Sequence, residues 1–197
     1  MWSFEPLKAL CMHLPSLETL SQGLAIAVST VAAITDARTG RIPNWLTGSA
    51  TVLGIGLCAT LGGIGSAGIS LLGVLLGVAV PGILYRGSQG RAIGGGDVKL
   101  FAALGALLGP TLGLETEFGA FLLLALFALI QLSYRGQLLS VLVNTVGLLC
   151  NPLLPTRWRR NIKPESLTAM RLGPAIAVSV VVTVFSERLV RLLPWFD

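Results

Sequence analysis

The feature that most constrains the fold is a series of long apolar segments, each long enough to cross a lipid bilayer as a helix. Hydrophobic residues make up 53% of the 197 residues and charged residues only 12%, against about 25% charged in a typical soluble domain. A transmembrane helix needs about 20 mostly apolar residues. Six segments approach this length, and we expect each to span the membrane: 19–35, 46–64, 67–85, 98–114, 118–134 and 172–190.

The sequence therefore predicts an all-α, polytopic integral membrane protein with a single domain over residues 1–197. Its first 18 residues contain charged, histidine and proline residues that interrupt any apolar run, which argues against a cleaved signal peptide. We expect segment 1–18 to lie at the extracytoplasmic surface of the membrane.

A seventh segment, 138–155, differs from the six predicted spans. Its small and polar residues recur three or four positions apart and would form one stripe on a helix: Ser140, Asn144, Gly147 and Asn151. This pattern favours an amphipathic helix lying in the membrane interface. A basic loop follows, so we expect residues 138–163 to form a cytoplasmic interfacial helix and basic loop.

Basic residues set the predicted orientation. The loops around residues 36 and 97, together with the connection 135–171, carry 11 of the 14 Lys and Arg residues. Positively charged loops stay on the cytoplasmic side. This places those loops in the cytoplasm, both termini outside it, and the short loop with Glu115 and Glu117 on the outer side. The net charge of +5 follows this topology, so we expect no nucleic-acid partner.

Metal and cofactor chemistry finds little support in the sequence. The three cysteines, Cys11, Cys58 and Cys150, stand apart from one another, and His13 is the single histidine. Structural zinc sites need four such ligands at close spacing. We expect no metal and no cofactor.

Two acids attract attention because each occurs where a predicted span meets the cytoplasmic side. Asp36 ends the first span and Asp97 opens the fourth, 61 residues later. Two predicted spans lie between them, and an even number of crossings returns the chain to the same face. Two carboxylates that face each other cannot easily both ionise, so one keeps a proton. Such a pair can activate a water with one acid and polarise a carbonyl with the other, as aspartic proteases do.

Three glycines precede the second acid. Gly94, Gly95 and Gly96 have no Cβ, so they leave room for an extended substrate strand. We group them with Pro43, Asn44 and Lys99 as candidate substrate-binding residues, Pro43 and Asn44 because they fix the turn after Asp36.

Simpler interpretations remain open at this point. Asp36 could cap a turn and Asp97 could be the N-cap of its helix. Paired acids at a membrane boundary also suit a proton-coupled transporter. A transporter would need polar groups at mid-depth, and the predicted spans show no acid or base near their middle. A non-catalytic pilus or secretion assembly protein is the other alternative.

Three blocks carry a resemblance to a known family. Residues 36–47, DARTGRIPNWLT, resemble the first signature of the type IV prepilin peptidases. Residues 94–105, GGGDVKLFAALG, resemble their second signature, whose GxGD core is shared with presenilin-type intramembrane aspartic proteases. Residues 171–177, RLGPAIA, are similar to a late segment of the family.

The resemblance implies an aspartic endopeptidase that removes the basic leader of type IV prepilins or pseudopilins at the cytoplasmic face of the bacterial inner membrane. Asp36 and Asp97 map onto the family's catalytic acids. The longer members carry an additional cytoplasmic region with paired CxxC motifs, associated with N-methylation, and this chain has neither. The resemblance thus favours a short, peptidase-only form such as those serving Flp-type pili.

Overall fold

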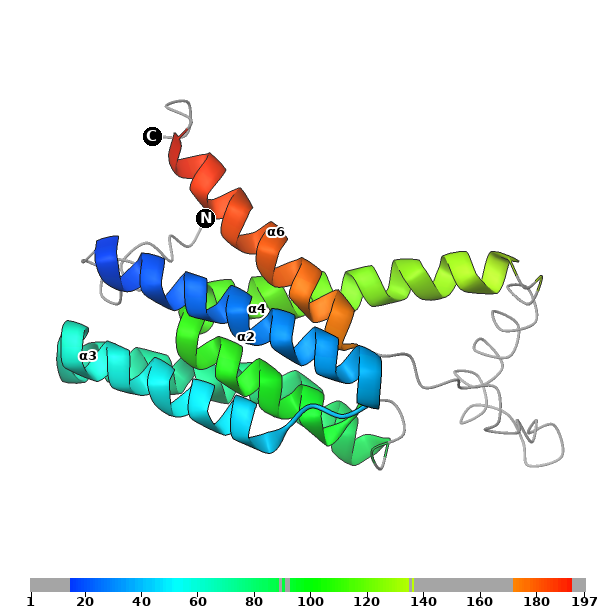
Figure 1. Cartoon of the computed structure of the whole chain (residues 1–197), viewed down its shortest axis with the longest axis horizontal. Helices are drawn as coiled ribbons and strands as arrows, with labels where there is room; N and C mark the ends of the chain where they lie inside the picture. The colour runs from blue at the N-terminus through cyan, green and yellow to red at the C-terminus, as the bar shows by residue number, and fades with distance from the viewer. Residues whose placement is uncertain (1–14, 89, 91–92, 135, 137–171, 193–197) are drawn as a thin grey trace, which may run out of the picture.

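The computed structural model describes residues 15–88, 90, 93–134, 136 and 172–192, and every element within this part of the chain is a helix. The helices, in chain order, are α2 (Pro15–Thr39), α3 (Asn44–Gly87), α4 (Gly95–Tyr134) and α6 (Gly173–Leu192) (Figure 1). All four are long and apolar enough to cross a membrane. The described residues thus support the predicted all-α membrane protein. The predicted interfacial helix and basic loop at 138–163, and all but residues 15–18 of the segment 1–18, lie outside the described residues.

The structure has four helices in the described residues, whereas the sequence predicted six spans. The numbers differ because α3 and α4 each include two of the predicted segments. Each of these helices has one residue with non-helical backbone angles: Gly63 (φ 78°, ψ −177°) in α3 and Gly109 (φ 76°, ψ −178°) in α4. This combination of angles is almost restricted to glycine. The two glycines therefore mark a break in each long helix.

Contacts across the breaks show that the chain turns back on itself. Phe101 and Phe121, one on each side of Gly109, stack with their ring centroids 5.8 Å apart. In a straight helix, two residues 20 positions apart would be separated by about 30 Å along the axis. Similarly, two glycines on opposite sides of Gly63 pack against neighbouring residues of α4: Gly54 lies against Ala106, and Gly73 lies against Gly105. Figure 1 shows the two segments of each long helix running back past each other.

The turn in α4 lies earlier than predicted. The sequence analysis placed Glu115 and Glu117 in an outer loop between two spans, but both are helical, and Glu117 is only 3% exposed. The expectation that these two acids lie in a loop was therefore wrong. The Gly109–Pro110 pair makes the turn instead, because glycine accepts the required angles and proline cannot donate the hydrogen bond of a continuous helix.

The first segment of α4, which carries Asp97, forms the centre of the core. Its residues Leu100, Phe101, Leu104 and Leu107 are at most 1% exposed. Glycines let the α3 backbone approach this segment: a Cβ on Gly77 would lie 2.5 Å from the carbonyl oxygen of Phe101. Close approach of this kind is the usual means of packing helices in membranes. It fixes the helix that carries Asp97 against α3.

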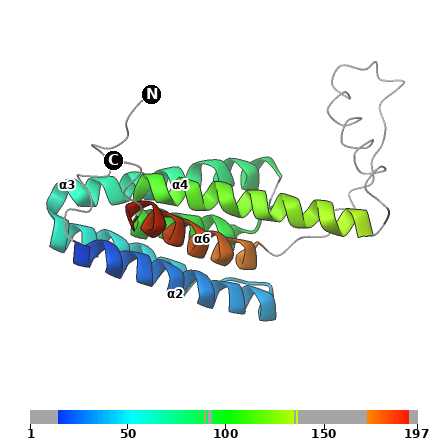
Figure 2. The same cartoon turned by 90° about the horizontal axis from the view of Figure 1, so that it is seen from above.

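Helix α6 lies between α2 and the second segment of α4 (Figure 2). Its inner face is buried through Ile176, Val180 and Val184. The Ser179 hydroxyl also donates a hydrogen bond to the carbonyl oxygen of Thr116 in α4, at 2.7 Å. The beginning of α6 lies at the end of α2, where Asp36 is located.

Candidate active site

Asp36 lies in the last turn of α2, and its side chain is buried, with 7% exposure. Gly40 follows the last residue of the helix, and its positive φ of 66° lets its N–H donate to the carbonyl oxygen of Asp36 at 2.9 Å. The Asp36 side chain does not cap this turn in the structure. Its Oδ2 accepts a hydrogen bond from the backbone N–H of Gly173, in α6, at 3.1 Å.

Asp97 lies in the first turn of α4 and is half-buried. The carbonyl oxygen of Gly94 accepts hydrogen bonds from the N–H groups of Asp97 and Val98, at 3.1 and 3.4 Å, so Gly94 is the capping residue of the helix. In the opposite direction, the Gly94 N–H donates a hydrogen bond to Oδ2 of Asp97 at 3.2 Å. This reciprocal arrangement resembles a capping box. The suggestion that Asp97 is the N-cap of its helix is therefore wrong in detail, because Gly94 takes that position. Asp97 contributes to the cap only through its Oδ2.

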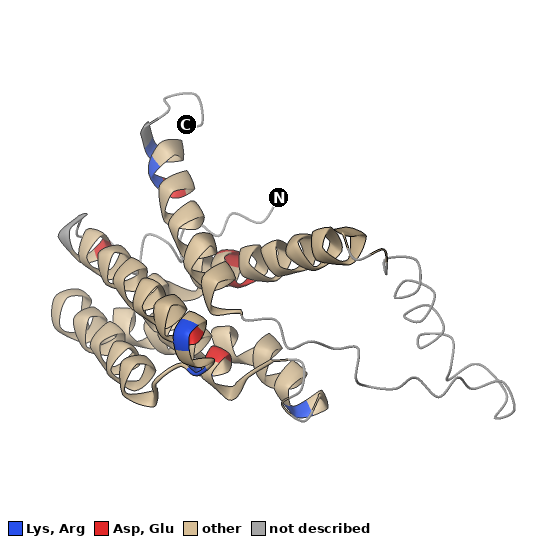
Figure 3. Ribbon diagram, turned by 45° about the vertical axis from the view of Figure 1, so that its right-hand side comes forward, with Lys and Arg blue, Asp and Glu red and all other residues tan. Residues whose placement is uncertain are grey.

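The two acids come from different helices but share one region. Asp97 lies close enough to Asp36 for their negative charges to repel each other. Figure 3 shows that, among the residues the structure describes, charged positions are few and occur mainly toward the ends of helices. Two acids in one partly buried region are expensive in a membrane protein, and such groups usually serve a function.

The turns that carry the acids also contact each other directly. A Cβ on Gly96 would lie 3.1 Å from the Cβ of Ile42, in the turn after α2. The Lys99 ammonium donates a hydrogen bond to Oδ1 of Asn44 at 2.8 Å. These contacts join the block 36–47 to the block 94–105.

The candidate substrate-binding residues gather around these two turns. Gly94 is exposed, while Gly95 lies near the Tyr85 ring and Gly96 near Ile42. Pro43 is the N-cap of α3, and its carbonyl oxygen accepts from the N–H groups of Leu46 and Thr47. Asn44 and Lys99 are exposed and bonded to each other. The spatial grouping agrees with the prediction, and whether these residues bind a substrate stays a prediction.

The arrangement can perform acid–base chemistry. Each carboxylate is held by one backbone N–H through its Oδ2, and neither acid is paired with a Lys or Arg in the described part of the chain. In the same part, no three His, Cys, Asp or Glu side chains are grouped as a metal ion would require. The site thus offers two neighbouring carboxyl groups able to share a water and a proton.

The sequence analysis did not assign a role to Gly173, although it lies in the third block that resembles the family. Its contact with Asp36 joins residues 137 positions apart. The resemblance of the block RLGPAIA to the family pointed to this region. However, a glycine at the start of a helix does not indicate in the sequence which side chain it contacts.

Comparison with known proteins gives one match. The model of the type IV leader peptidase family matches residues 23–129, more than half of the chain, and this range includes both acids and their turns. No curated protein and no solved structure showed significant similarity to the chain.

Proposed function

Because the chain belongs to the type IV leader peptidase family, and is thus a peptidase, we propose that it is a membrane-embedded aspartic endopeptidase with Asp36 and Asp97 as its catalytic pair. The observation that supports the proposal is the direct contact between the turns that carry these two acids, Gly96 against Ile42 and Lys99 hydrogen-bonded to Asn44. The two acids come from the ends of separate helices, and their charges interact across a partly buried site.

In the proposed mechanism, the ionised acid takes a proton from a bound water while the protonated acid donates a hydrogen bond to the scissile carbonyl. The resulting hydroxide adds to the carbonyl carbon. Breakdown of the tetrahedral intermediate cleaves the C–N bond, and the leaving amine takes up a proton from the pair. In the described part of the chain, the hydrogen bonds to these two carboxyl groups are made through Oδ2, so we assign these steps to Oδ1 of each acid.

The proposed substrate is a type IV prepilin or pseudopilin, such as an Flp-type pilin, which carries a basic leader before a hydrophobic helix. An extended segment at the leader boundary would bind beside Gly94, which is exposed, with Gly95, Gly96, Pro43, Asn44 and Lys99 around it. Without a Cβ, Gly94 lets a substrate main chain approach Asp97 closely.

We further propose a single membrane domain of six crossings in the bacterial inner membrane. Each segment on either side of Gly63 and Gly109 would be one crossing, since a straight 44-residue helix would be about 66 Å long, roughly twice the hydrocarbon thickness. The acids and most of the basic residues would then face the cytoplasm, where the positive-inside rule places them.

Leader removal from a prepilin tests this function. Candidate prepilins of the same genome are co-expressed with the wild-type protein, Asp36→Asn or Asp97→Asn, and products are followed by gel shift and N-terminal sequencing. Glu115→Gln is the matched control, because Glu115 is an exposed acid away from the site. We expect cleavage by wild type and by the control, and uncleaved prepilin with either Asn variant.

Other outcomes would redirect the proposal. Cleavage by Asp97→Asn would make Asp97 only a helix cap. Assembly of pili without any dependence on the two acids would favour the non-catalytic assembly role, and proton-linked transport that is lost in both Asn variants would favour the transporter.

A further inference from the structure

One contact at the site lies outside the two turns that carry the acids. Gly173 opens α6, and its N–H donates to Oδ2 of Asp36 at 3.1 Å in a buried position. The carboxylate otherwise lies at the C-terminal end of α2, where the helix dipole is unfavourable for a negative charge. The N-terminal end of α6 has the opposite polarity, so this contact compensates for the position of Asp36.

The same contact depends on the absence of a side chain. A Cβ on Gly173 would lie 2.8 Å from both Cβ and Oδ2 of Asp36 and 3.1 Å from its Cγ. Nonbonded carbon atoms are normally separated by about 3.5 Å or more. Any larger residue at this position would have to move either Asp36 or α6.

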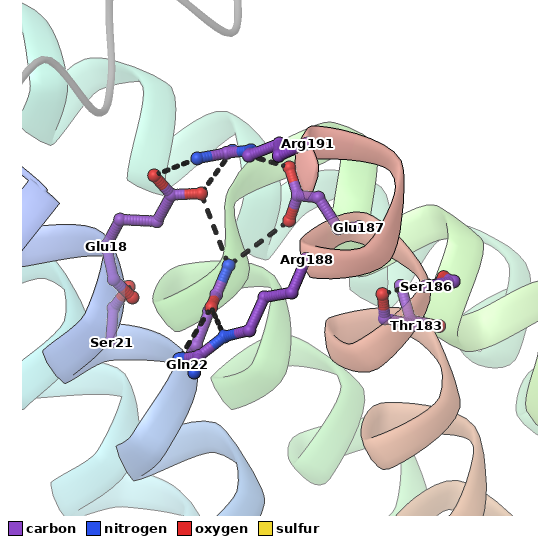
Figure 4. A network of polar contacts seen from close by, with 8 residues as sticks. All are labelled: Glu18, Ser21, Gln22, Thr183, Ser186, Glu187, Arg188 and Arg191. Atoms are coloured by element: carbon purple, nitrogen blue, oxygen red, sulfur yellow. Dashed lines mark hydrogen bonds and ion pairs between the residues drawn. The ribbon is translucent and has the colours of Figure 1, made fainter. Parts of the chain in front are cut away.

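Helix α6 is held in place at its other end. There, a polar network joins it to the start of α2 (Figure 4). Arg191 forms ion pairs with Glu18 and with Glu187, and the Arg188 guanidinium donates to the side-chain oxygen of Gln22 at 3.3 Å. The Gln22 amide in turn donates to Glu187 at 3.1 Å. Because α2 and α6 are joined at both ends, α6 cannot easily slide away from Asp36.

We propose that Gly173 is a positioning residue for catalysis: its N–H orients the Asp36 carboxylate, and its missing side chain lets α6 begin directly against that acid. This inference rests on the proposed function, in which Asp36 is catalytic. It assigns the third sequence block, around residues 171–177, a role in the site.

The first test is kinetic and uses the full-length protein with a prepilin that wild type cleaves. Gly173→Ala should lower kcat by about 100-fold, as expected when a catalytic group is displaced by about 1 Å, and change KM by less than about twofold. Gly23→Ala is the matched control, because a Cβ on Gly23 in α2 meets no atom within 4 Å. Wild-type kcat in Gly173→Ala would overturn the proposal.

A thermal-unfolding cycle tests the contact without relying on activity. Gly173→Ala is compared with the parent protein and again in an Asp36→Gly background, where all three close contacts are absent. We expect a clear fall in the unfolding midpoint in the first comparison and at most half of that fall in the second. An equal fall in both backgrounds would show that Asp36 is not what Gly173 accommodates.

Together the two tests separate the possible failures. A fully active Gly173→Ala beside an inactive Asp36→Asn would end this inference and leave the proposed function in place. If Asp36→Asn is active, the proposed function is wrong. Gly173 then has no role in catalysis, whatever the thermal-unfolding cycle shows.

Discussion

Replacing Gly63 or Gly109 with alanine should destabilise the protein, even though a Cβ at either position meets no atom within 4 Å. The reason lies in the backbone alone. At φ of 78° and 76° with ψ near 180°, a residue with a Cβ costs about 1–3 kcal/mol. In a straight helix, the same substitution would stabilise by roughly 0.5–1 kcal/mol. The sign of the change therefore reports whether the chain turns back at these glycines.

The assay is unfolding of the purified protein in mixed micelles with increasing SDS, followed by far-UV circular dichroism. Gly68→Ala is the control, since Gly68 is helical, exposed and equally free of close neighbours, and it should stabilise slightly. If Gly63→Ala and Gly109→Ala also stabilise, α3 and α4 run straight and the reasoning about six crossings is wrong.

Two further predictions concern the interior. In Gly73→Ala, the added methyl group would clash with the carbonyl oxygen of Gly105. The free energy of unfolding should therefore fall by about 1–3 kcal/mol. A free energy of unfolding equal to that of Gly68→Ala would refute the close packing of α3 on α4. Glu117→Met should raise the free energy of unfolding by about 1–3 kcal/mol, because Oε2 of this buried side chain has no hydrogen-bond partner in the described part of the chain. A lower free energy of unfolding would contradict this reasoning and indicate that the carboxyl group has a stabilising partner.

Hydrophobic patterning was enough to predict the class of fold and the approximate extent of the helices. It also placed Asp36 at the end of one helix and Asp97 at the start of another, which the structure confirms. Both predictions depend on strong local signals, since lipid requires long apolar segments and a charged residue marks where such a segment ends. The shared location of the two acids followed from counting crossings between them.

The position of the turns could not be obtained from charge in the same way. Glu115 and Glu117 suggested a polar loop, yet a helix can bury an acid at a packed interface, and Glu117 is buried there. The Gly109–Pro110 pair was the better signal, since glycine followed by proline marks a turn. The contact of Gly173 with Asp36 was not predictable, because it depends on the docking of α6 against α2 and not on any local sequence preference.

Glycines pack the helices that carry the two acids, and they do so differently on each side of the site. On the side of Asp97, Gly73, Gly77 and Gly105 let α3 and α4 approach until backbone meets backbone, which fixes the helix that Asp97 opens. On the side of Asp36, Gly173 lets α6 begin against the carboxylate itself. If the two acids are the catalytic pair, a methyl group added in either place should impair cleavage. At Gly173 it would contact the Asp36 carboxyl group directly, whereas at Gly73, Gly77 or Gly105 it would meet only backbone atoms of the facing helix. In the proposed function, these glycines therefore contribute to catalysis as well as to close helix packing.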